Sequence, residues 1–206
     1  MLAMKATVRE MAVGRRRAFD PEAALERATE VFWRSGYEGA SLHELTRAMG
    51  INPPSLYMAF GNKDGLFRRA LDRYADRRAE FMAEVLARPT ARRVAERYLF
   101  GSAELMSGTE DPPGCLLVQS GIACGAAGSG VPQELALRRA GPEAALRARF
   151  ERARSEGDLP ADAAPSALAR YLSTVNYGMA VQAGAGVGAD ALKEIAAVAM
   201  LAWPAR

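Results

Sequence analysis

Few side chains in this chain of 206 residues are suited to nucleophilic or metal chemistry: one histidine, His43, and two cysteines, Cys115 and Cys124. A serine-type catalytic triad needs a histidine beside a nucleophile, and a zinc site needs several histidines or cysteines at short spacing. The two cysteines stand nine residues apart without a Cys-x-x-Cys motif, and His43 lies within a helix-start signal. The sequence therefore predicts no enzyme, no metal site and no cofactor, and His43 is expected to be an exposed helix residue.

The cysteines leave two interpretations open. In a reducing cytoplasm, both Cys115 and Cys124 pack as small buried hydrophobic side chains. Alternatively, they are a thiol pair whose oxidation changes the surrounding helices, which is the chemistry of a redox sensor.

Two short amphipathic helices joined by a tight turn stand out in the N-terminal third. The first begins at Ser41, with Glu44 three residues later in the spacing of a capping box. It ends at Gly50, and Asn52-Pro53 then begins the second helix as N-cap and first helical residue. This spacing is typical of a helix-turn-helix, whose second helix enters the major groove of DNA, although any pair of antiparallel helices can carry such caps.

The residues around these helices separate the two possibilities, because together they resemble the DNA-binding domain of TetR-family transcriptional regulators. The resemblance covers about a quarter of the chain and is carried by Phe32-Trp33-Arg34-Ser35-Gly36-Tyr37, Ser41-Leu42, Ala48-Met49-Gly50, Ser55-Leu56-Tyr57, Phe60 and Asn62-Lys63-Asp64. Pro54 departs from the family, which most often has a small flexible residue there. The run Gly114-Cys115-Leu116-Leu117 is similar to one in a subset of the family.

The resemblance implies a homodimeric regulator, expected to be a repressor, that leaves a pseudo-palindromic double-stranded DNA operator when a small-molecule effector binds. Residues expected to face base edges are Pro53, Pro54, Ser55, Met58 and Ala59, with Asn52 capping their helix. Residues expected to hold phosphates are Ser41, Tyr57 and Lys63.

The positive charge of the chain is concentrated at its N-terminus. The net charge is +3, and residues 1–20 hold five basic and two acidic residues, so the remainder balances at 22 against 22. Arg15, Arg16 and Arg17 therefore form a basic arm, expected to neutralise phosphates or to enter the adjacent minor groove. Met11 is a second possible start, and beginning there keeps all three arginines.

The rest of the chain predicts an all-α protein of about nine helices, because no segment alternates like a strand. We expect a basic arm at 1–18, a three-helix DNA-binding domain at 19–66, and an effector-binding and dimerisation bundle at 67–206. Expected helices after the first three are a linking helix ending near Arg88 and helices at 91–107, 115–126, 132–156 with a break at Gly141-Pro142, 165–183 and 189–203. No apolar run is long enough to span a bilayer and no signal sequence is recognised, so we expect a cytoplasmic protein without membrane contact.

The bundle offers two sets of candidate residues. Aromatic, sulfur-containing and polar residues within apolar helices are expected to line an effector pocket; they are Tyr98, Met106, Cys115, Gln119, Ile122, Cys124, Phe150, Tyr171, Asn176 and Tyr177. The last two helices are apolar on more than one face and are expected to form the dimer interface, through Leu168, Leu172, Val175, Leu192, Ile195 and Ala199.

Overall fold

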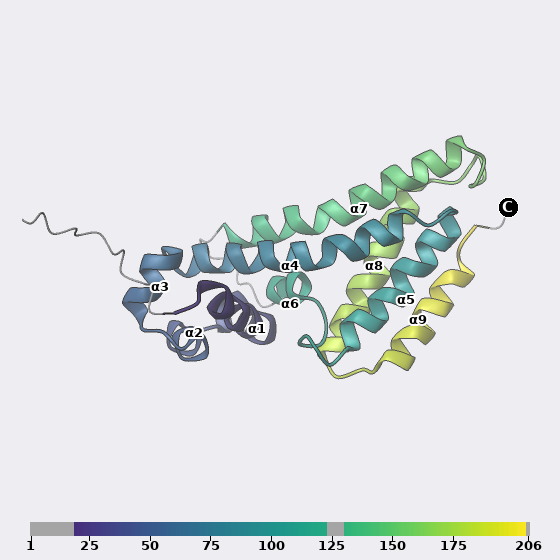
Figure 1. Ribbon diagram of the computed structural model, residues 1–206. Coiled ribbons are helices and arrows are strands. Elements are labelled where there is room, and N and C mark those ends of the chain that lie inside the picture. Colours follow the sequence, from purple (N-terminus) through teal and green to yellow (C-terminus); the bar gives the residue numbers. More distant parts are fainter. Residues whose placement is uncertain (1–18, 123–129, 205–206) are drawn as a thin grey trace, which may run out of the picture.

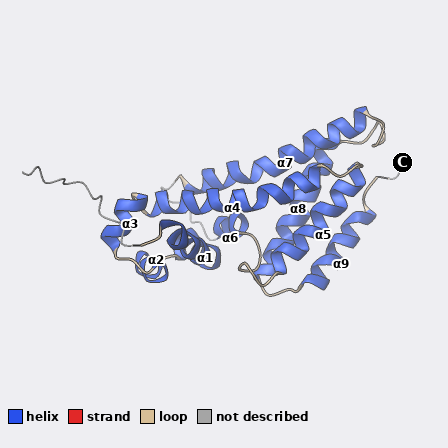
Figure 2. Ribbon diagram, viewed as in Figure 1, coloured by secondary structure: helices blue, strands red, loops and turns tan. Residues whose placement is uncertain are grey.

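The computed structural model describes residues 19–122 and 130–204. Over these ranges the chain forms nine helices and no strand, which confirms the predicted all-α fold (Figures 1 and 2). The helices are α1 Pro21–Gly39, α2 Leu42–Met49, α3 Pro53–Phe60, α4 Lys63–Leu86, α5 Ala91–Ser107, α6 Leu116–Ile122, α7 Val131–Ser155, α8 Pro165–Gly184 and α9 Ala189–Leu201. The basic arm and Cys124 lie outside the described residues.

The helix-turn-helix forms where the capping signals indicate. The Ser41 hydroxyl oxygen accepts a hydrogen bond from the Glu44 backbone N–H at 3.1 Å and begins α2. Gly50 ends α2 at φ 68°, a left-handed conformation that glycine adopts without the steric cost of a side chain. Asn52 then caps α3 by accepting from the Ser55 N–H at 2.9 Å, and Pro53 stands at the first helical position.

The three N-terminal helices close around an aromatic core. Phe32 of α1 meets Phe67 of α4 edge to face, with ring centroids 4.9 Å apart, and Tyr37 lies 5.1 Å from the same Phe67 ring. Leu45 of α2 and Leu56 of α3 are completely buried in the same core. The orientation of α3 is therefore determined by packing against its neighbours and the start of α4.

Helix α4 belongs to both halves of the molecule. It starts beside α3 and runs without interruption for 24 residues into the C-terminal bundle, where α7 extends alongside it (Figure 1). The domain boundary expected at residue 66 falls within its first turn. The two halves are thus joined by one continuous helix rather than by a flexible linker.

The C-terminal half is a bundle in which α8 packs against α7 as well as against α5 and α9 (Figure 1). Helix α6 packs against α1, so the bundle also contacts the DNA-binding half away from α4. None of the helices in the described part of the chain is both long and apolar enough to cross a membrane.

The expected break at Gly141-Pro142 is wrong, because α7 is continuous from Val131 to Ser155 with Pro142 inside it. A proline within a helix removes one backbone donor, and its ring also crowds the side chain of the preceding residue. Gly141 has no Cβ, which relieves that second clash.

The other expected helix limits agree with the structure to within two residues where both ends are described. Helix α1 continues beyond Gly36 across a non-helical turn and ends at Gly39. The expected end of the 115–126 helix lies outside the described residues, and α6 is described to Ile122.

Candidate DNA-binding surface and ligand cavity

Helix α3 presents a mixed apolar and polar face to solvent. Leu56 and Phe60 are buried, whereas Pro53, Pro54 and Met58 are exposed. Met58 is 85% exposed, which leaves its thioether available for contact. Of the other expected base-reading positions, Ser55 and Ala59 are half-buried.

Two of the expected phosphate contacts lie at helix N-termini, because Ser41 caps α2 and Lys63 is the first residue of α4. The Ser41 oxygen accepts from the α2 backbone, which leaves its hydroxyl hydrogen for an outside acceptor. Asn52 and Asn62 cap α3 and α4 in the same way, with Asn62 accepting from the Gly65 N–H at 2.7 Å. Backbone N–H groups at such ends favour anions such as phosphate.

Lys63 is held beside this surface at the start of α4. Its ammonium nitrogen lies 4.5 Å from the centre of the Tyr37 ring, in a cation–π arrangement. The Tyr37 hydroxyl in turn donates to the Asp64 carboxylate. Lys63 is half-buried and Tyr57 is 47% exposed on α3, so both side chains are accessible from solvent. Arg15, Arg16 and Arg17 lie outside the described residues.

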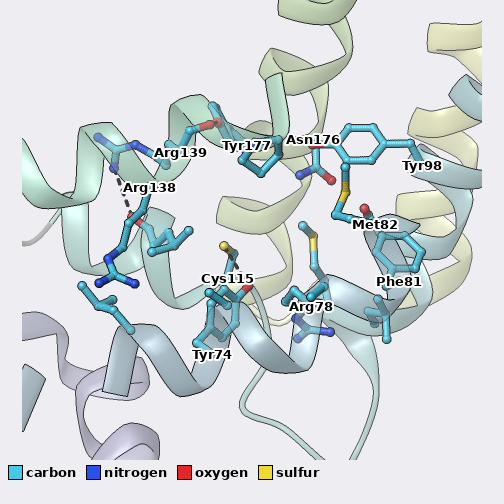
Figure 3. Close-up of a pocket in the computed structure, with 18 residues that line it drawn as sticks. Tyr74, Arg78, Phe81, Met82, Tyr98, Cys115, Arg138, Arg139, Asn176 and Tyr177 are labelled. Carbon is cyan, nitrogen blue, oxygen red and sulfur yellow. Dashed lines mark hydrogen bonds between the residues drawn. The ribbon is translucent and has the colours of Figure 1, made fainter. Parts of the chain in front are cut away.

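A cavity of about 240 Å³ lies in the other half of the molecule, between α4, α5, α7 and α8 (Figure 3). It is mainly apolar. Five of the ten residues expected to line an effector pocket border it: Tyr98, Met106, Cys115, Asn176 and Tyr177. These five residues are up to 79 positions apart in the sequence.

Phe150, Tyr171 and Gln119, which were also expected in the pocket, do not line the cavity. Phe150 is fully buried against Trp203, with ring centroids 5.4 Å apart, because its side of α7 faces the chain that follows α9. Tyr171 points to the surface between α8 and α9, where its hydroxyl donates to the Ala199 carbonyl at 3.1 Å. The Gln119 amide donates to the Pro113 carbonyl instead. The side chain of Ile122, like all of Cys124, is not described.

The sequence analysis missed the wall that α4 contributes. Leu71, Tyr74, Arg78, Phe81 and Met82 all line the cavity. These positions recur mainly at steps of three or four, which is the spacing of one helix face. That stripe continues beyond the residues needed to pack the helix-turn-helix. Its length could have indicated from the sequence that α4 has a second buried surface.

Burial keeps the tyrosines of the cavity uncharged. Desolvation raises the pKa of the Tyr74 phenol well above its ordinary value, with the neighbouring Cys115 adding to the shift. Desolvation likewise raises the pKa of Tyr98 and of Tyr177. The three phenols therefore serve as neutral hydroxyl groups.

Tyr74 connects the cavity to the DNA-binding half. Its hydroxyl donates to the Cys115 sulfur at 3.1 Å on the cavity side. Its ring meets Trp33 of α1 edge to face at 4.9 Å on the other side. Any molecule that displaces Tyr74 must also change the packing of α1 on α4.

The expected dimer residues divide between the interior and the surface of the protomer. Leu172 and Leu192 are completely buried in their own bundle and Ala199 is 6% exposed, so the packing of α8 and α9 against α5 accounts for them without a partner. Leu168 and Val175 are half-buried, and Ile195 is exposed. The exposed large apolar side chains on the two helices are instead Tyr171, Val181, Ile195, Val198 and Leu201.

An all-helical fold with an N-terminal helix-turn-helix, joined by one helix to a bundle that encloses a cavity, defines a class of DNA-binding transcriptional regulators. Comparison with known proteins agrees. Residues 24–70 match the family described as bacterial regulatory proteins, tetR family. The chain is 32% identical over 193 residues to the HTH-type transcriptional repressor ComR of Escherichia coli (strain K12), covering 93% of this chain and 92% of that one.

Solved structures give the same result. The chain is 40% identical to a cysteine mutant of the TetR family transcriptional regulator CifR complexed with 26-base-pair double-strand operator DNA, with a TM-score of 0.88 over 93% of this chain and 100% of that one. The reduced form of E. coli NemR, at 21% identity and a TM-score of 0.71 over 86% of this chain and 94% of that one, shares the fold. The chain belongs to the TetR family of transcriptional regulators.

Proposed function

We propose that this protein is a homodimeric repressor that binds a pseudo-palindromic operator in the cytoplasm and leaves it when a small molecule enters the cavity. The observation that carries the proposal is the position of Tyr74, which contacts both the cavity and Trp33 of the DNA-binding half. Residues 19–66 read DNA in this proposal, residues 67–206 sense and dimerise, and residues 1–18 supply the basic arm.

The exposed surface of α3 supports its role as the recognition helix. Met58 and the two prolines can contact thymine methyl groups, and Ser55 can donate to or accept from a base edge. Pro53 and Pro54 lack backbone N–H groups, so phosphate binding near α3 relies on the N-termini of α2 and α4. Selection of bound sequences from random duplexes tests this, because a two-fold symmetric consensus is expected and a non-palindromic consensus contradicts it.

Lys63 provides a test of phosphate contact. Lys63→Ala should weaken binding to every sequence and reduce the dependence of log K on log salt by about one unit, since one phosphate contact is lost. Lys193→Ala is the matched control, because Lys193 pairs with Glu104 at 2.9 Å in the distant bundle. An unchanged salt dependence in Lys63→Ala would show that this lysine does not hold a phosphate.

The surface of α8 and α9 supports the homodimer. Exposed residues recur along α8 at steps of three and four and continue on α9; they are Ala167, Tyr171, Thr174, Gly178, Val181 and Ala185 at α8, and Ala191, Ile195, Val198 and Leu201 on α9. Two protomers joined through this surface would bury a four-helix contact and place two α3 helices on one face of DNA.

A charge on this surface should separate the protomers. Val198→Glu, at a residue that is 67% exposed, should halve the mass seen by sedimentation and reduce operator affinity by more than about tenfold, because linked half-sites lose their avidity. Leu137→Glu is the control: Leu137 is a similarly exposed apolar residue, but it lies on α7. Equal behaviour of the two variants would remove α8 and α9 from the interface.

Release by an effector follows from the same arrangement by linkage. A compound that binds only the form with a displaced Tyr74 must lower affinity for the operator by the same factor by which DNA lowers affinity for the compound. A screen should therefore find compounds that raise the melting temperature and lower operator affinity together. A constitutive DNA-binding protein with an inert cavity would show neither effect with any compound.

The alternative is a thiol-based redox regulator that uses Cys115 and Cys124. Its structural support is the place of Cys115 in the cavity wall, within hydrogen-bond distance of Tyr74. Double substitution of both cysteines by serine distinguishes the two: the redox mechanism requires that peroxide release the wild-type protein from DNA and leave the double variant bound. Release of both proteins by peroxide, or of neither, would remove this alternative.

A further inference from the structure

The amide of Asn176 places an unpartnered polar atom in the apolar wall of the cavity. Asn176 is only 8% exposed, and its Oδ1 atom is buried with no hydrogen-bond partner among the described residues. Figure 3 shows the amide reaching from α8 into the space between Tyr177 and Tyr98, opposite the α4 wall. A buried polar atom without a partner costs about 1–3 kcal/mol, so such atoms are rare in folded proteins.

We propose that the cavity binds a small neutral alcohol carrying a ring, whose hydroxyl group pairs with the Asn176 amide. A hydroxyl group both donates and accepts, so it can give its hydrogen to Oδ1 and take one from the amide N–H. This inference rests on the effector site proposed above and names the chemistry of its ligand.

The size of the cavity sets the size of the molecule. A protein cavity of about 150 Å³ binds benzene, so 240 Å³ suits roughly ten non-hydrogen atoms, a benzene ring with a short side chain. The composition of the wall suits a ring. Tyr74, Phe81, Tyr98 and Tyr177 offer aromatic faces and edges, and the sulfur atoms of the neighbouring methionines are favourable partners for an aromatic ring.

The charges at the cavity argue for a neutral ligand. Arg138 pairs with Asp72 and Glu134 at 2.6 Å each, and Arg78 pairs with Asp111 at 3.4 Å. The Arg139 guanidinium donates to the Leu117 carbonyl. In Figure 3 the Arg138 and Arg139 side chains lie at the far end of the cavity from Asn176.

The tyrosine side chains in the cavity wall carry no charge either. Burial raises the pKa of Tyr74, Tyr98 and Tyr177, so all three stay protonated at physiological pH. An anionic ligand would therefore have to compete with a carboxylate for Arg78 or Arg138, or lie beside Arg139 at the far end of the cavity from Asn176. A cationic ligand would meet no carboxylate among the described residues that form the wall.

Three probes of nearly equal size test the proposal by calorimetric titration of the purified full-length protein: 2-phenylethanol, its methyl ether, and phenylacetate. The alcohol is expected to bind at least about fivefold more tightly than the ether, because the ether cannot donate to Oδ1. The alcohol should also bind at least about fivefold more tightly than phenylacetate. Asn176→Leu, which keeps a similar volume, should remove the preference for alcohol over ether, whereas Met106→Leu in the same wall should keep it.

The outcomes separate this inference from the proposed function. Equal binding of alcohol and ether, a preference for phenylacetate, an unchanged preference in Asn176→Leu, or no binding of any probe would each overturn the ligand class. Fluorescence anisotropy with a selected duplex gives the second measurement. If 2-phenylethanol binds through Asn176 and leaves DNA affinity unchanged, the ligand class stands and effector release fails. If another compound releases the protein from DNA while the alcohol does not bind, effector release stands and the proposed ligand class fails.

Discussion

The helices toward the two ends of this chain begin in different ways. Every helix from α1 to α5 begins with a side chain that accepts a backbone N–H: Asp20, Ser41, Asn52, Asn62 and Thr90. Helices α7, α8 and α9 begin at Gly130, Ala164 and Gly188, none of which makes a side-chain cap.

The caps matter most for the shortest of these helices. Helices α2 and α3 have eight residues each and bury few side chains, and isolated helices of that length are unstable in water. Their ends must therefore be specified locally. Helix α7 has 25 residues and α8 has 20, and packing over several turns holds them without caps.

The largest expected effect tests how strongly packing stabilises α7, which has no side-chain cap. Leu146 is fully buried on α7, so Leu146→Ala should lower the free energy of unfolding by about 2–5 kcal/mol through the lost contacts and the cavity left behind. Leu137→Ala is the same substitution on the same helix at a residue that is 73% exposed, and it should change stability by about 0.5 kcal/mol at most. Urea denaturation measures both, and similar losses would contradict the comparison.

Burial in the C-terminal half should also appear as a loss of stability in alkali. The pKa of Tyr98 is raised from its ordinary 10.0, so above that pH the unfolded chain loses a proton that the folded chain keeps. Its contribution is complete below pH 10 and is lost as pH rises above it, with a slope of up to about 1.4 kcal/mol per pH unit. Tyr98→Phe should make the fall in unfolding free energy above the ordinary tyrosine pKa shallower; an unchanged slope would show that this phenol is not shielded.

Removing the cap of α3 should reduce both the stability of the protein and its affinity for DNA. Asn52→Ala removes the acceptor of the Ser55 N–H and should cost about 1 kcal/mol in unfolding free energy. It should also weaken operator binding, because α3 loses its defined start. Asn52→Ser retains a capping oxygen and serves as the control. A loss of affinity equal in both variants would assign Asn52 to direct DNA contact instead.

Adding a cap where none exists is the smallest and sharpest test. Ala164 precedes α8 in an extended conformation, with φ −102° and ψ 94°, which suits a capping residue. Ala164→Ser should therefore raise the free energy of unfolding by about 0.5–1 kcal/mol. Thermal denaturation measures the change. Destabilisation would show that the bare start of α8 is required by its packing.

The helix-turn-helix and the cavity also differ in how much of each could be predicted from the sequence alone. Ser41, Gly50 and Asn52 mark the boundaries of their helices within a few residues of themselves, so the helix-turn-helix could be located from short stretches of sequence. The exposure of Met58 also follows from its place away from Leu56 and Phe60 on an amphipathic helix. Local signals sufficed there because the local chain determines the geometry.

The cavity could be predicted only in part, because its walls meet through tertiary packing. Tyr74 and Cys115 are 41 residues apart and belong to segments whose contact no local pattern encodes. Phe150 and Tyr171 are residue types that often line pockets. Their positions on α7 and α8, however, turn Phe150 toward Trp203 and Tyr171 toward the surface. Residue type indicated which side chains can line a pocket, and the register of each helix decided which of them do.

Because α4 is uninterrupted, a small tilt near the cavity would produce a larger displacement at the DNA-binding helices. At 1.5 Å per residue its 24 residues form a rod about 36 Å long, with cavity residues toward one end and the DNA-binding helices at the other. A tilt of about 5° would move the far end by about 3 Å. In the proposed dimer, two-fold symmetry would double the change between recognition helices spaced for one turn of about 34 Å. A rearrangement the size of one rotated tyrosine ring would thus become a misfit on the scale of a base-pair step.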